Sequence, residues 1–589
     1  MEALISQLTK DAQNVLKTLY DIEVGTIDWQ NTRKDFEGDL TLVVFPYLKQ
    51  SKKNPVLTAT EVGESLLENS TLVAGFNVVK GFLNLVIDKQ WWINAIRDAN
   101  GSTSLVVQID SPHGVMVEYS SPNTNKPLHL GHIRNCLLGW SVGNLQQAIG
   151  HDVSRVQIIN DRGIHICKSM VAWLRFANGE TPESSGLKGD HLVGKYYVLF
   201  DQHYRTQIAE AIENGADEET AKKDAPIMVE AREMLIRWEQ NDPEVMDLWN
   251  TMNGWVYEGF NETYRSMGVS FDKNYYESNT YKLGKTLVEE GLKKGVFSRE
   301  DDGSVWIDLT DDGLDKKILL RSDGTSVYMT QDMGTAVQRF EDYDIAQLIY
   351  TVGNEQDYHF KVLFKILEKL GYEWSDGLFH LSYGMVDLPS GKMKSREGTV
   401  VDADDLIEKM TKSAAEVSAS LGKTDGMSET EKQTLHRQIG LGALKYYILK
   451  VDPRKRMTFN PEESIDLHGN TGPFIQYTHA RIKSLLRKAN IASSADNVKS
   501  VLPEEVELIK TLLRYAQTVH QAANEMSPAL IANYVYELVK TYNGYYQSHS
   551  ILHNDDDSVT SWRLLLSEQT ARVIADGLHL LGIDAPEQM

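Results

Sequence analysis

A predicted strand, helix and second strand follow one another between residues 114 and 159, and this order constrains the fold more than any other feature. The segment GVMVEYS at 114–120 alternates apolar side chains, which predicts a strand. A helix is predicted from about 130 to 150, where Gly150 supplies a stop, and a second strand at 152–159. Two strands joined by a crossover helix lie parallel in one sheet. We therefore expect a Rossmann-type parallel sheet that binds a nucleotide.

The rest of the chain divides into regions of different pattern, and 589 residues are enough for several cores. We expect a multidomain α/β protein with an α+β N-terminal domain at 1–105 and a Rossmann-type domain at 106–415. A charged helical insertion is predicted at about 170–270, and an all-α bundle at 416–589. Further sheet-like segments are predicted at 318–321, 326–330, 346–352 and 378–385.

The composition argues against several classes of protein. Two cysteines, Cys136 and Cys167, are too few for a disulfide scaffold or a four-thiolate zinc site, so we expect no structural zinc and a reducing, cytoplasmic compartment. No apolar run is long enough to cross a bilayer, and no signal peptide is recognisable. The net charge of −23 argues against a nucleic-acid partner, although a local basic face can still bind RNA.

Two histidines lie where the loop after the first predicted strand leads into the helix. His129 and His132 lie in SSPNTNKPLHLGHIRN at 120–135, with Gly131 between them. A helix N-terminus offers unpaired N–H donors and a positive dipole to anions, and glycine lets a phosphate or adenine approach the backbone. The two imidazoles can then hydrogen-bond a transferring phosphoryl group. Taken alone, such a short motif more often marks a helix cap and a surface histidine.

A second motif, GMVDLPSGKMKSREGTVV at 384–401, is cationic and bounded by glycines. Lys392, Lys394 and Arg396 lie between Gly391 and Gly398. Three cations on a glycine-flanked loop suit closure over a triphosphate and stabilisation of departing pyrophosphate. By itself the segment fits a solvated basic loop equally well.

Together the two motifs resemble the signatures of class I aminoacyl-tRNA synthetases, and further segments narrow the resemblance to the arginyl-tRNA synthetases. The segments follow the family's order along essentially the whole chain. They are EYSSPNTNKPLHLGHIRN, FDKNYYES, SDGTSVYMTQD, VGNEQDYH, QYTHARI, YVYELVKTYNGYYQ and GLHLLGIDAPEQM, with GDL at 38 and GFLNL at 81 resembling the family's N-terminal tRNA-binding domain.

The resemblance implies a ligase of protein biosynthesis that activates L-arginine with ATP and Mg²⁺ and transfers it to the 3′-terminal adenosine of tRNA(Arg). It implies that pyrophosphate exchange requires tRNA, that the C-terminal bundle binds the anticodon, and that no prosthetic group is needed. A monomer without membrane contact is expected.

The resemblance also implies which residues form the site, and we expect no protein-bound metal. The residues implied to be catalytic are Lys126, His129, His132, Lys392 and Lys394. Those implied to bind arginine are Glu118, Asn123, Glu277, Tyr328, Asp332 and Gln356, because a guanidinium needs planar acceptor oxygens. Those implied to bind ATP are Gly131, Gly353, Glu355, Met385 and Val386. Other interpretations stay open: Glu118 pairs only with a neighbour, His359 is structural, Asp332 is a surface acid and Tyr328 a core residue.

One departure from the family's pattern concerns the cationic loop. The usual class I loop has a lysine one place after Lys394, where this chain has Ser395. Arginine enzymes commonly lack that lysine, and a lysine just before HLGH compensates for it. This chain has both Lys126 and Lys394, so the division of labour between them is open.

The segment QYTHARIKSLLRKA at 476–489 predicts a basic amphipathic helix for RNA recognition. An ordinary surface helix fits the pattern as well. Its cations are Arg481, Lys483, Arg487 and Lys488, and the residues predicted to face the core are Ile482, Leu485 and Leu486. Candidates to stack on unpaired bases are Tyr477, Tyr542, Tyr545 and Tyr546, although most helical tyrosines belong to the core.

Two other functions compete with this interpretation. A small-molecule nucleotidylyltransferase shares HxGH and the Rossmann core, but it lacks a helical bundle such as residues 420–589 predict. A catalytically inactive paralogue that binds RNA or acts as a scaffold would be expected to have degraded site residues, whereas His129, His132, Asn123, Asp332 and Gln356 are intact.

Overall fold

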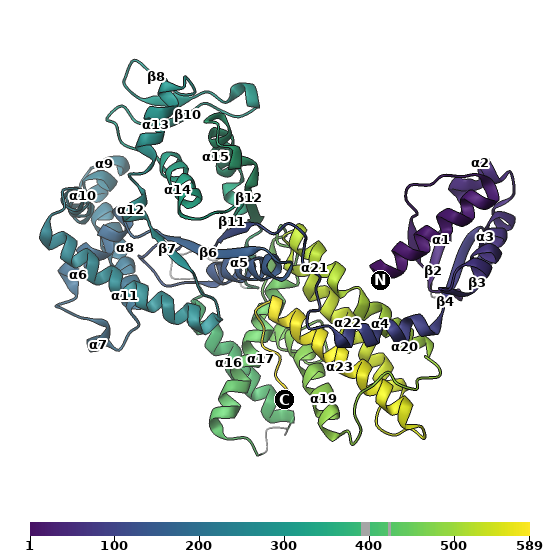
Figure 1. The fold of residues 1–589 in the computed structure, drawn as a ribbon. Helices are drawn as coiled ribbons and strands as arrows, with labels where there is room; N and C mark the ends of the chain where they lie inside the picture. Colours follow the sequence, from purple (N-terminus) through teal and green to yellow (C-terminus); the bar gives the residue numbers. More distant parts are fainter. Residues whose placement is uncertain (34, 390–400, 422–425) are drawn as a thin grey trace.

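A five-stranded parallel sheet forms the centre of the molecule in the computed structural model, which describes residues 1–589 except 34, 390–400 and 422–425 (Figure 1). The strand order is β12-β11-β5-β6-β7, so the chain adds strands on one side of β5 and then on the other. Ligands of such sheets bind outside the carboxyl ends of the strands at the point where the order changes side. The Rossmann-type prediction is confirmed. The strands are β5 (Gly114–Glu118), β6 (Asp152–Ile159), β7 (Lys273–Tyr276), β11 (Gln347–Gly353) and β12 (Leu378–Tyr383).

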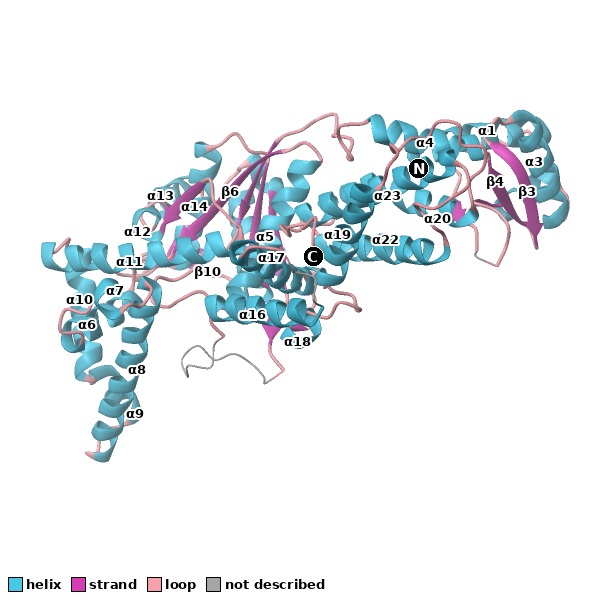
Figure 2. Cartoon of the chain, turned by 90° about the horizontal axis from the view of Figure 1, so that it is seen from below, coloured by secondary structure: helices cyan, strands magenta, loops and turns pink. Residues whose placement is uncertain are grey.

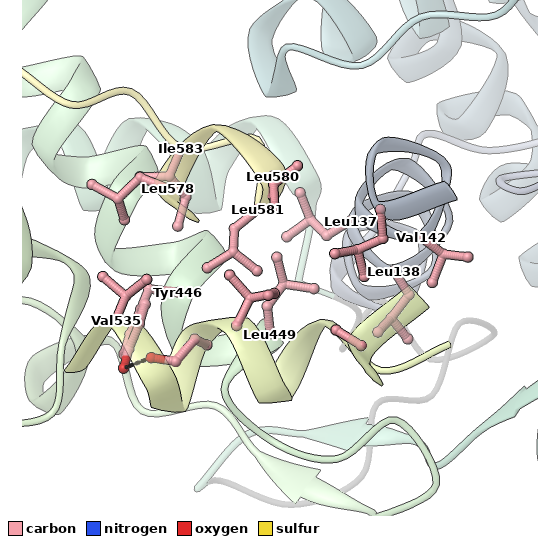
Figure 3. Packing of buried hydrophobic residues seen from close by; sticks show 14 of the residues in the cluster. Leu137, Leu138, Val142, Tyr446, Leu449, Val535, Leu578, Leu580, Leu581 and Ile583 are labelled. Carbon is pink, nitrogen blue, oxygen red and sulfur yellow. Dashed lines mark hydrogen bonds between the residues drawn. The ribbon is translucent and has the colours of Figure 1, made fainter. Parts of the chain in front are cut away.

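Helix α5 (Leu130–Ala148) connects β5 to β6, close to its predicted bounds, and is buried on almost every side. A helix of this kind belongs between two layers of structure. Figure 3 shows Leu137, Leu138 and Val142 of α5 facing Leu449 and Leu581 from the C-terminal helices. One hydrophobic core therefore runs from the parallel sheet into the C-terminal bundle.

Six helices between β6 and β7 form the predicted insertion. One of the two longest, α11 (Pro243–Met267), is capped at both ends. It begins where Asp242 accepts hydrogen bonds from two backbone N–H groups, and it ends at Gly268, which has φ 68°. The helices are α6 (Ile164–Phe176), α7 (Pro182–Ser185), α8 (Gly189–Glu213), α9 (Glu218–Asp224), α10 (Pro226–Glu239) and α11 (Pro243–Met267).

Between β7 and β11 the structure departs from two predictions. The strand at Lys317–Leu320 (β10) exists, but it joins a separate antiparallel sheet with β8 (Ser298–Arg299) and β9 (Val305–Ile307). The strand predicted at 326–330 is wrong, because α14 (Tyr328–Asp342) begins there. Its buried residues recur at helical spacing, and their burial outweighs the local strand pattern. The remaining elements are α12 (Glu277–Thr280), α13 (Gly284–Lys293) and η2 (Thr310–Asp312).

After β11 the chain adds the last strand and then becomes helical, as predicted. The boundary expected at 415–416 falls inside α16, so the helical region begins earlier than predicted. The predicted segment 378–385 stops at Tyr383, and β13 (Val386–Asp387) pairs instead with β14 (Met457–Thr458). The elements are η3 (Asn354–Gln356), α15 (Asp357–Lys369), η4 (Glu373–Gly377), α16 (Ala403–Leu421), α17 (Glu429–Leu449), α18 (Pro461–Ser464), α19 (Gly472–Lys488), α20 (Pro503–Leu513), α21 (Tyr515–Asn524), α22 (Pro528–Ser548) and α23 (Asp557–Leu580).

The N-terminal region is an α+β unit with a four-stranded antiparallel sheet in the order β1-β2-β4-β3. Figure 2 shows β3 and β4 at one end of the molecule and the insertion helices at the other. In the described part of the chain, no helix has the length and apolarity needed to cross a membrane. The elements are α1 (Glu2–Tyr20), β1 (Trp29–Asn31), β2 (Leu40–Val43), η1 (Phe45–Tyr47), α2 (Leu48–Ser51), α3 (Pro55–Asn69), β3 (Val73–Val79), β4 (Phe82–Ile87) and α4 (Lys89–Gly101).

Candidate active site

Two half-buried histidines begin helix α5 at the carboxyl edge of the parallel sheet. His129 is the N-cap residue: its Nδ1 accepts a hydrogen bond from the Gly131 N–H (3.1 Å), and His132 Nδ1 accepts one from the His129 N–H (3.1 Å). Burial lowers the pKa of His129 to about 4 and holds the pKa of His132 well below its usual value, so both rings are neutral at pH 7. Because Nδ1 is the acceptor in each ring, the proton sits on Nε2, where it can be donated to a ligand.

Lys126 precedes these histidines on the loop between β5 and α5. Burial lowers the pKa of its ammonium, and among the residues that the structure describes none forms an ion pair or hydrogen bond with it. The side chain lines a cavity of about 490 Å³ that also contacts His129 and reaches His191 and Gln202 of α8. An unpaired, partly desolvated cation beside a helix N-terminus is suited to hold an anion.

The segments on either side of the predicted cationic loop are held in place. Before it, Val386 of β13 pairs with β14. After it, Val401 O accepts a hydrogen bond from Leu130 N (3.1 Å), and Asp402 lies opposite His129 in a short antiparallel bridge. All the residues singled out in the loop lie outside the described residues: Gly391, Lys392, Lys394, Ser395, Arg396 and Gly398.

A second cavity, of about 180 Å³, lies at the ends of β5 and β11 beside α14. Asp332 and Gln356, both predicted to bind arginine, line it together with His359. His359 Nε2 lies 2.6 Å from Asp332 Oδ2 and orients this carboxylate. Tyr328 stands one helical turn before Asp332, the spacing that places both on one face, and it is 78% exposed rather than a core residue.

Glu118 lines the same cavity, but both of its carboxylate oxygens are engaged by protein groups. One forms a buried ion pair with the Arg339 guanidinium, and the other accepts a hydrogen bond from Ser121 Oγ (3.0 Å). Arg339 is 1% exposed and lies against the ring of Tyr350. Glu118 therefore pairs with a neighbour, which was the open alternative. The sequence motifs do not point to Arg339, although it follows Asp332 by two helical turns on one face of α14.

Glu277 begins α12 with a buried carboxyl group. Burial raises its pKa to about 7, the charges of Asp161 and Asp332 add to that rise, and the Arg162 guanidinium opposes it. Asp161, which the sequence analysis did not single out, accepts hydrogen bonds from Ser278 N and Ser278 Oγ, each at 2.8 Å. A guanidinium that reaches this group meets acceptor oxygens and favours the ionised form of Glu277.

Asn123 stands on the loop that leaves β5. Just before it, Ser120 and Ser121 have a left-handed backbone, with φ of 69° and 48°. The loop is tied to the residues after β6, because Thr124 N donates a hydrogen bond to Asn160 O (3.1 Å). The Asn123 side chain is exposed, so it lies outside the core and can reach a ligand.

The residues predicted to bind ATP lie at the ends of α5, β11 and β12. Gly353 ends β11, and a Cβ at this position would lie 3.6 Å from Met385 Sδ, so these two residues are adjacent. Glu355 is exposed in the turn that follows. A side chain on Gly131 would meet the His129 ring at 2.9 Å. Val386 is 3% exposed, so its side chain lies in the core and a ligand can use only its backbone.

Among the described residues, one group could offer three ligand atoms to a metal ion: His191, Asp402 and Asp404, with these atoms within 4.8 Å of one another. The His191 Nε2 lies 2.8 Å from Asp402 Oδ2. The Lys188 ammonium pairs with Asp404 and lies 3.2 Å from Asp190. A protein cation therefore already supplies the positive charge that these carboxylates attract.

The predicted RNA-binding helix is α19, and some of its cations are neutralised by the end of the chain. Lys483 Nζ lies 2.9 Å from Glu587 Oε1, and Arg487 donates a hydrogen bond to the Glu587 carbonyl oxygen (3.1 Å). Arg481 is bonded to Asn543. Ile482 and Leu485 are buried, as predicted. Leu486 is half-buried and Lys488 is exposed.

Two of the four tyrosines predicted to stack on bases are core residues. Tyr542 is 0% exposed and Tyr545 is 2% exposed, and they bond to Ser567 of α23 and Glu505 of α20. Their helix α22 is covered by α20 and α23, so the prediction is wrong for both. Tyr477 and Tyr546 are half-buried on the same side of the bundle, where the Arg481 guanidinium lies 4.8 Å from the Tyr546 ring centre.

Known proteins match this chain along nearly its whole length. Residues 98–460 match the model of the catalytic domain of class I (R) tRNA synthetases, and residues 475–589 match the DALR anticodon binding domain. The chain is 56% identical to an arginine–tRNA ligase of Flavobacterium psychrophilum over 99% of both chains. It is 53% identical to one of Porphyromonas gingivalis over 100% of both.

Solved structures show the same fold at much lower identity. The arginyl-tRNA synthetase of Thermus thermophilus superposes with a TM-score of 0.76 at 23% identity, with 100% of both chains covered. That of Plasmodium falciparum gives a TM-score of 0.76 at 18% identity, covering 100% of this chain and 99% of the other. The chain belongs to the arginyl-tRNA synthetase family.

Proposed function

We propose that this chain activates L-arginine with ATP, releases pyrophosphate, and transfers the arginyl group to the 3′-terminal adenosine of tRNA(Arg). The observation that carries the proposal is a pair of cavities lined by residues at and just after the carboxyl end of β5. One is lined by Asp332, near Glu277, and the other by Lys126 and His129. The first suits a cationic side chain and the second suits a polyphosphate.

On the arginine side, Asp332 and Glu277 receive the guanidinium, with the Tyr328 hydroxyl at the start of α14. Asn123 and Gln356 hold the α-amino and carboxylate groups. Glu118 contributes its charge to the cavity, but Arg339 and Ser121 fix its position, as both of its oxygens are bonded to them.

On the ATP side, His129 and His132 donate from Nε2 to phosphate oxygens and Lys126 balances their charge. Gly131 lets the nucleotide approach α5, the turn at Gly353 and Glu355 receives the ribose, and Met385 with the Val386 backbone borders the adenine. Mg²⁺ enters with ATP as part of the substrate. Lys392 and Lys394 are expected to help stabilise the departing pyrophosphate.

In the first step, an oxygen of the arginine carboxylate attacks the α-phosphorus of ATP and the bond to the pyrophosphate oxygen breaks. In the second, a ribose hydroxyl of the terminal adenosine, the 2′-hydroxyl if the chain follows its class, attacks the adenylate carbonyl and AMP leaves. No covalent enzyme intermediate is required. The protein contributes positioning and electrostatic stabilisation, which are large terms when groups are preorganised.

Residues 1–105 and the C-terminal helices are proposed to contact tRNA, with the catalytic unit between them. The catalytic unit is proposed to include α16 and α17, because the match to the catalytic-domain model extends to residue 460. We expect a monomer that acts in the cytoplasm. The compartment is inferred from the role in protein synthesis and from the free thiols of Cys136 and Cys167.

Pyrophosphate exchange into ATP, measured with each amino acid in turn and with or without tRNA, tests the proposal. Exchange is expected with arginine alone, and only when tRNA is present. Exchange with lysine but not arginine would overturn the substrate assignment. Strong exchange without tRNA would overturn only the tRNA requirement.

A further inference from the structure

Asn135, in the second turn of α5, ties together the ends of three central strands. Its Nδ2 donates hydrogen bonds to Thr351 O (2.7 Å) on β11 and to the Tyr383 hydroxyl (3.1 Å) at the end of β12. Its Oδ1 accepts one from the Ser120 N–H, just past β5. The side chain is 7% exposed, so these bonds form away from water. One amide thereby uses both donor hydrogens and its carbonyl on three different strands.

Each of these strands leads directly to a group with a proposed substrate contact. β5 continues into the loop that carries Asn123, β11 ends at Gly353, and β12 precedes Met385. Helix α5 itself begins with His129 and Gly131. Asn135 therefore joins the arginine-binding loop to both turns proposed to hold the adenosine.

The first of these connections holds a strained turn. Ser120 and Ser121 both have positive φ, which L-residues adopt only when surrounding contacts fix it. Asn135 bonds to the Ser120 N–H, and the Ser120 hydroxyl bonds to the Tyr264 hydroxyl (2.7 Å). The backbone N–H of Ser120 depends on Asn135, because its only hydrogen-bond partner among the described residues is this side chain.

We propose that Asn135 is a positioning residue for adenylation, which sets the arginine-binding loop against the two ATP-binding turns. The inference rests on the proposed function, because those contacts come from it. Two substrates must be held with their reacting atoms in line, and misplacement by about 1 Å costs on the order of 10²-fold in rate. Loss of Asn135 is therefore expected to lower the rate of bound substrates more than it weakens the binding of either.

The substitution Asn135→Asp tests the role through one atom. The carboxyl group has the shape of the amide and can still accept from Ser120 N–H, but its second oxygen faces Thr351 O. When ionised it repels that carbonyl, and when protonated it can donate to it as Nδ2 does. Burial raises the pKa of a carboxyl group, so protonation is expected to return as the pH falls towards 6.

The groups around Asn135 whose pKa values are shifted lose or gain their protons outside the range from pH 8 to pH 6. Burial raises the pKa of Tyr383 to about 12 and that of Cys136 to about 12, and it lowers the pKa of Arg134 to about 10. Burial also holds the pKa of His132 well below its usual value. Other ionisable neighbours of this cluster include Tyr264 and Tyr119, whose pKa values are raised by burial, Glu355 beside Tyr383, and Glu118, which is bonded to Ser121.

Gln146 on the same helix provides a matched control. It is 3% exposed, and its Nε2 donates to Ala523 O (2.8 Å) in the C-terminal bundle, far along α5 from the strand ends. Gln146→Glu makes the same amide-to-acid exchange against a backbone carbonyl. It should lower the Tm without introducing a pH-dependent loss of adenylation.

Single-turnover adenylation is measured from pH 8 to pH 6 at varied ATP and arginine concentrations with saturating tRNA, and each variant's rate at saturation is divided by the wild-type rate at the same pH. For Asn135→Asp we expect a deficit of about 10²-fold at pH 8, nearly unchanged KM values, and a clear recovery by pH 6. A ratio that does not change with pH, or a change confined to KM, overturns the proposal. A wild-type protein that forms no arginyl-adenylate contradicts the proposed function instead.

Tyr383→Phe provides a second test of the positioning role if the Asn135→Asp variant does not fold. It removes only the hydroxyl that Asn135 bonds at 3.1 Å and leaves the ring in the core. A several-fold slower single turnover with both KM values unchanged supports the positioning role. A wild-type rate overturns it.

Discussion

The arginine side and the phosphate side of the candidate site differ in whether their charged side chains are paired with other residues of the protein. On the arginine side, Asp332 is bonded to His359, and Glu118 is paired with the buried Arg339. On the phosphate side, no residue of the described structure pairs with the Lys126 ammonium, and the neighbouring His129 is neutral at pH 7.

This difference indicates what each substrate finds. A partly buried charge without a partner costs free energy, and the cost disappears when a ligand of opposite charge binds. Paired carboxylates are already oriented, so a guanidinium meets fixed oxygens. Loss of one cation should therefore damage the phosphate side severely, whereas the arginine side divides its charge among several acids.

The largest expected effect follows Lys126→Ala. Removing one preorganised donor to a developing anion costs on the order of 10²–10³ in rate, and we expect that loss in single-turnover adenylation. Lys195 is a matched control: it lines the same cavity but lies 2.7 Å from Glu180, so Lys195→Ala should stay close to the wild-type rate. An equal loss in both variants would remove the distinction between paired and unpaired cations.

The same measurement decides between the two lysines that compete for the role of the missing loop lysine. Lys394→Ala should cost less than Lys126→Ala, because its place in the sequence is offset by one residue from that of the usual lysine. Ser395→Lys in the Lys126→Ala background should recover part of the rate. A nearly wild-type Lys126→Ala together with an inactive Lys394→Ala would show that the loop works alone.

The next largest effect is expected for Asp332→Asn, which keeps the shape of the side chain but removes its charge. Losing one partner of a desolvated ion pair costs about 2–5 kcal/mol. The KM for arginine should therefore rise by about one to three orders of magnitude, and the KM for ATP should hardly change. Equal damage to both constants would mean that Asp332 supports the fold instead.

A smaller effect is expected from the titration of Glu277. Burial raises its pKa to about 7, and a bound guanidinium favours the ionised form. Above pH 7 the group is already ionised, whereas below pH 7 arginine must displace a proton. The KM for arginine should thus rise about tenfold from pH 8 to pH 6. Glu277→Gln should give a high KM without this pH dependence, and an unchanged slope in that variant would assign the titration to another group.

The sequence predicted the order of elements better than their partners. The unit from β5 to β6 was predicted nearly to the residue, because alternation and helical spacing are local properties. The strand predicted at 326–330 failed because burial of Met329 and Met333 against the sheet decides for a helix there. Tyr542 looked available for stacking because its burial depends on α20 and α23, which pack onto it from distant parts of the chain.

The candidate site shows the same limit. The motifs located His129, Asp332 and their neighbours, but not the buried partners that hold them. Arg339 and Asn135 meet Glu118, Thr351 and Tyr383 only through tertiary contacts. A single sequence shows such residues as an ordinary helical arginine and asparagine.

The smallest expected effect applies the comparison of paired and unpaired cations to α19. Lys483 is held by Glu587, whereas exposed Lys488 has no partner within the described residues. One lost phosphate contact on single-stranded RNA changes affinity by about fivefold at 0.1 M salt, so Lys488→Ala should weaken tRNA binding by about that factor and flatten its salt dependence. Lys483→Ala should change binding less, and Glu587→Gln should strengthen it by freeing Lys483. Fluorescence titration of tRNA at two salt concentrations measures all three. Equal losses for both lysines would show that the Glu587 pair opens when tRNA binds, and that pairing in the free protein does not determine which cations contact RNA.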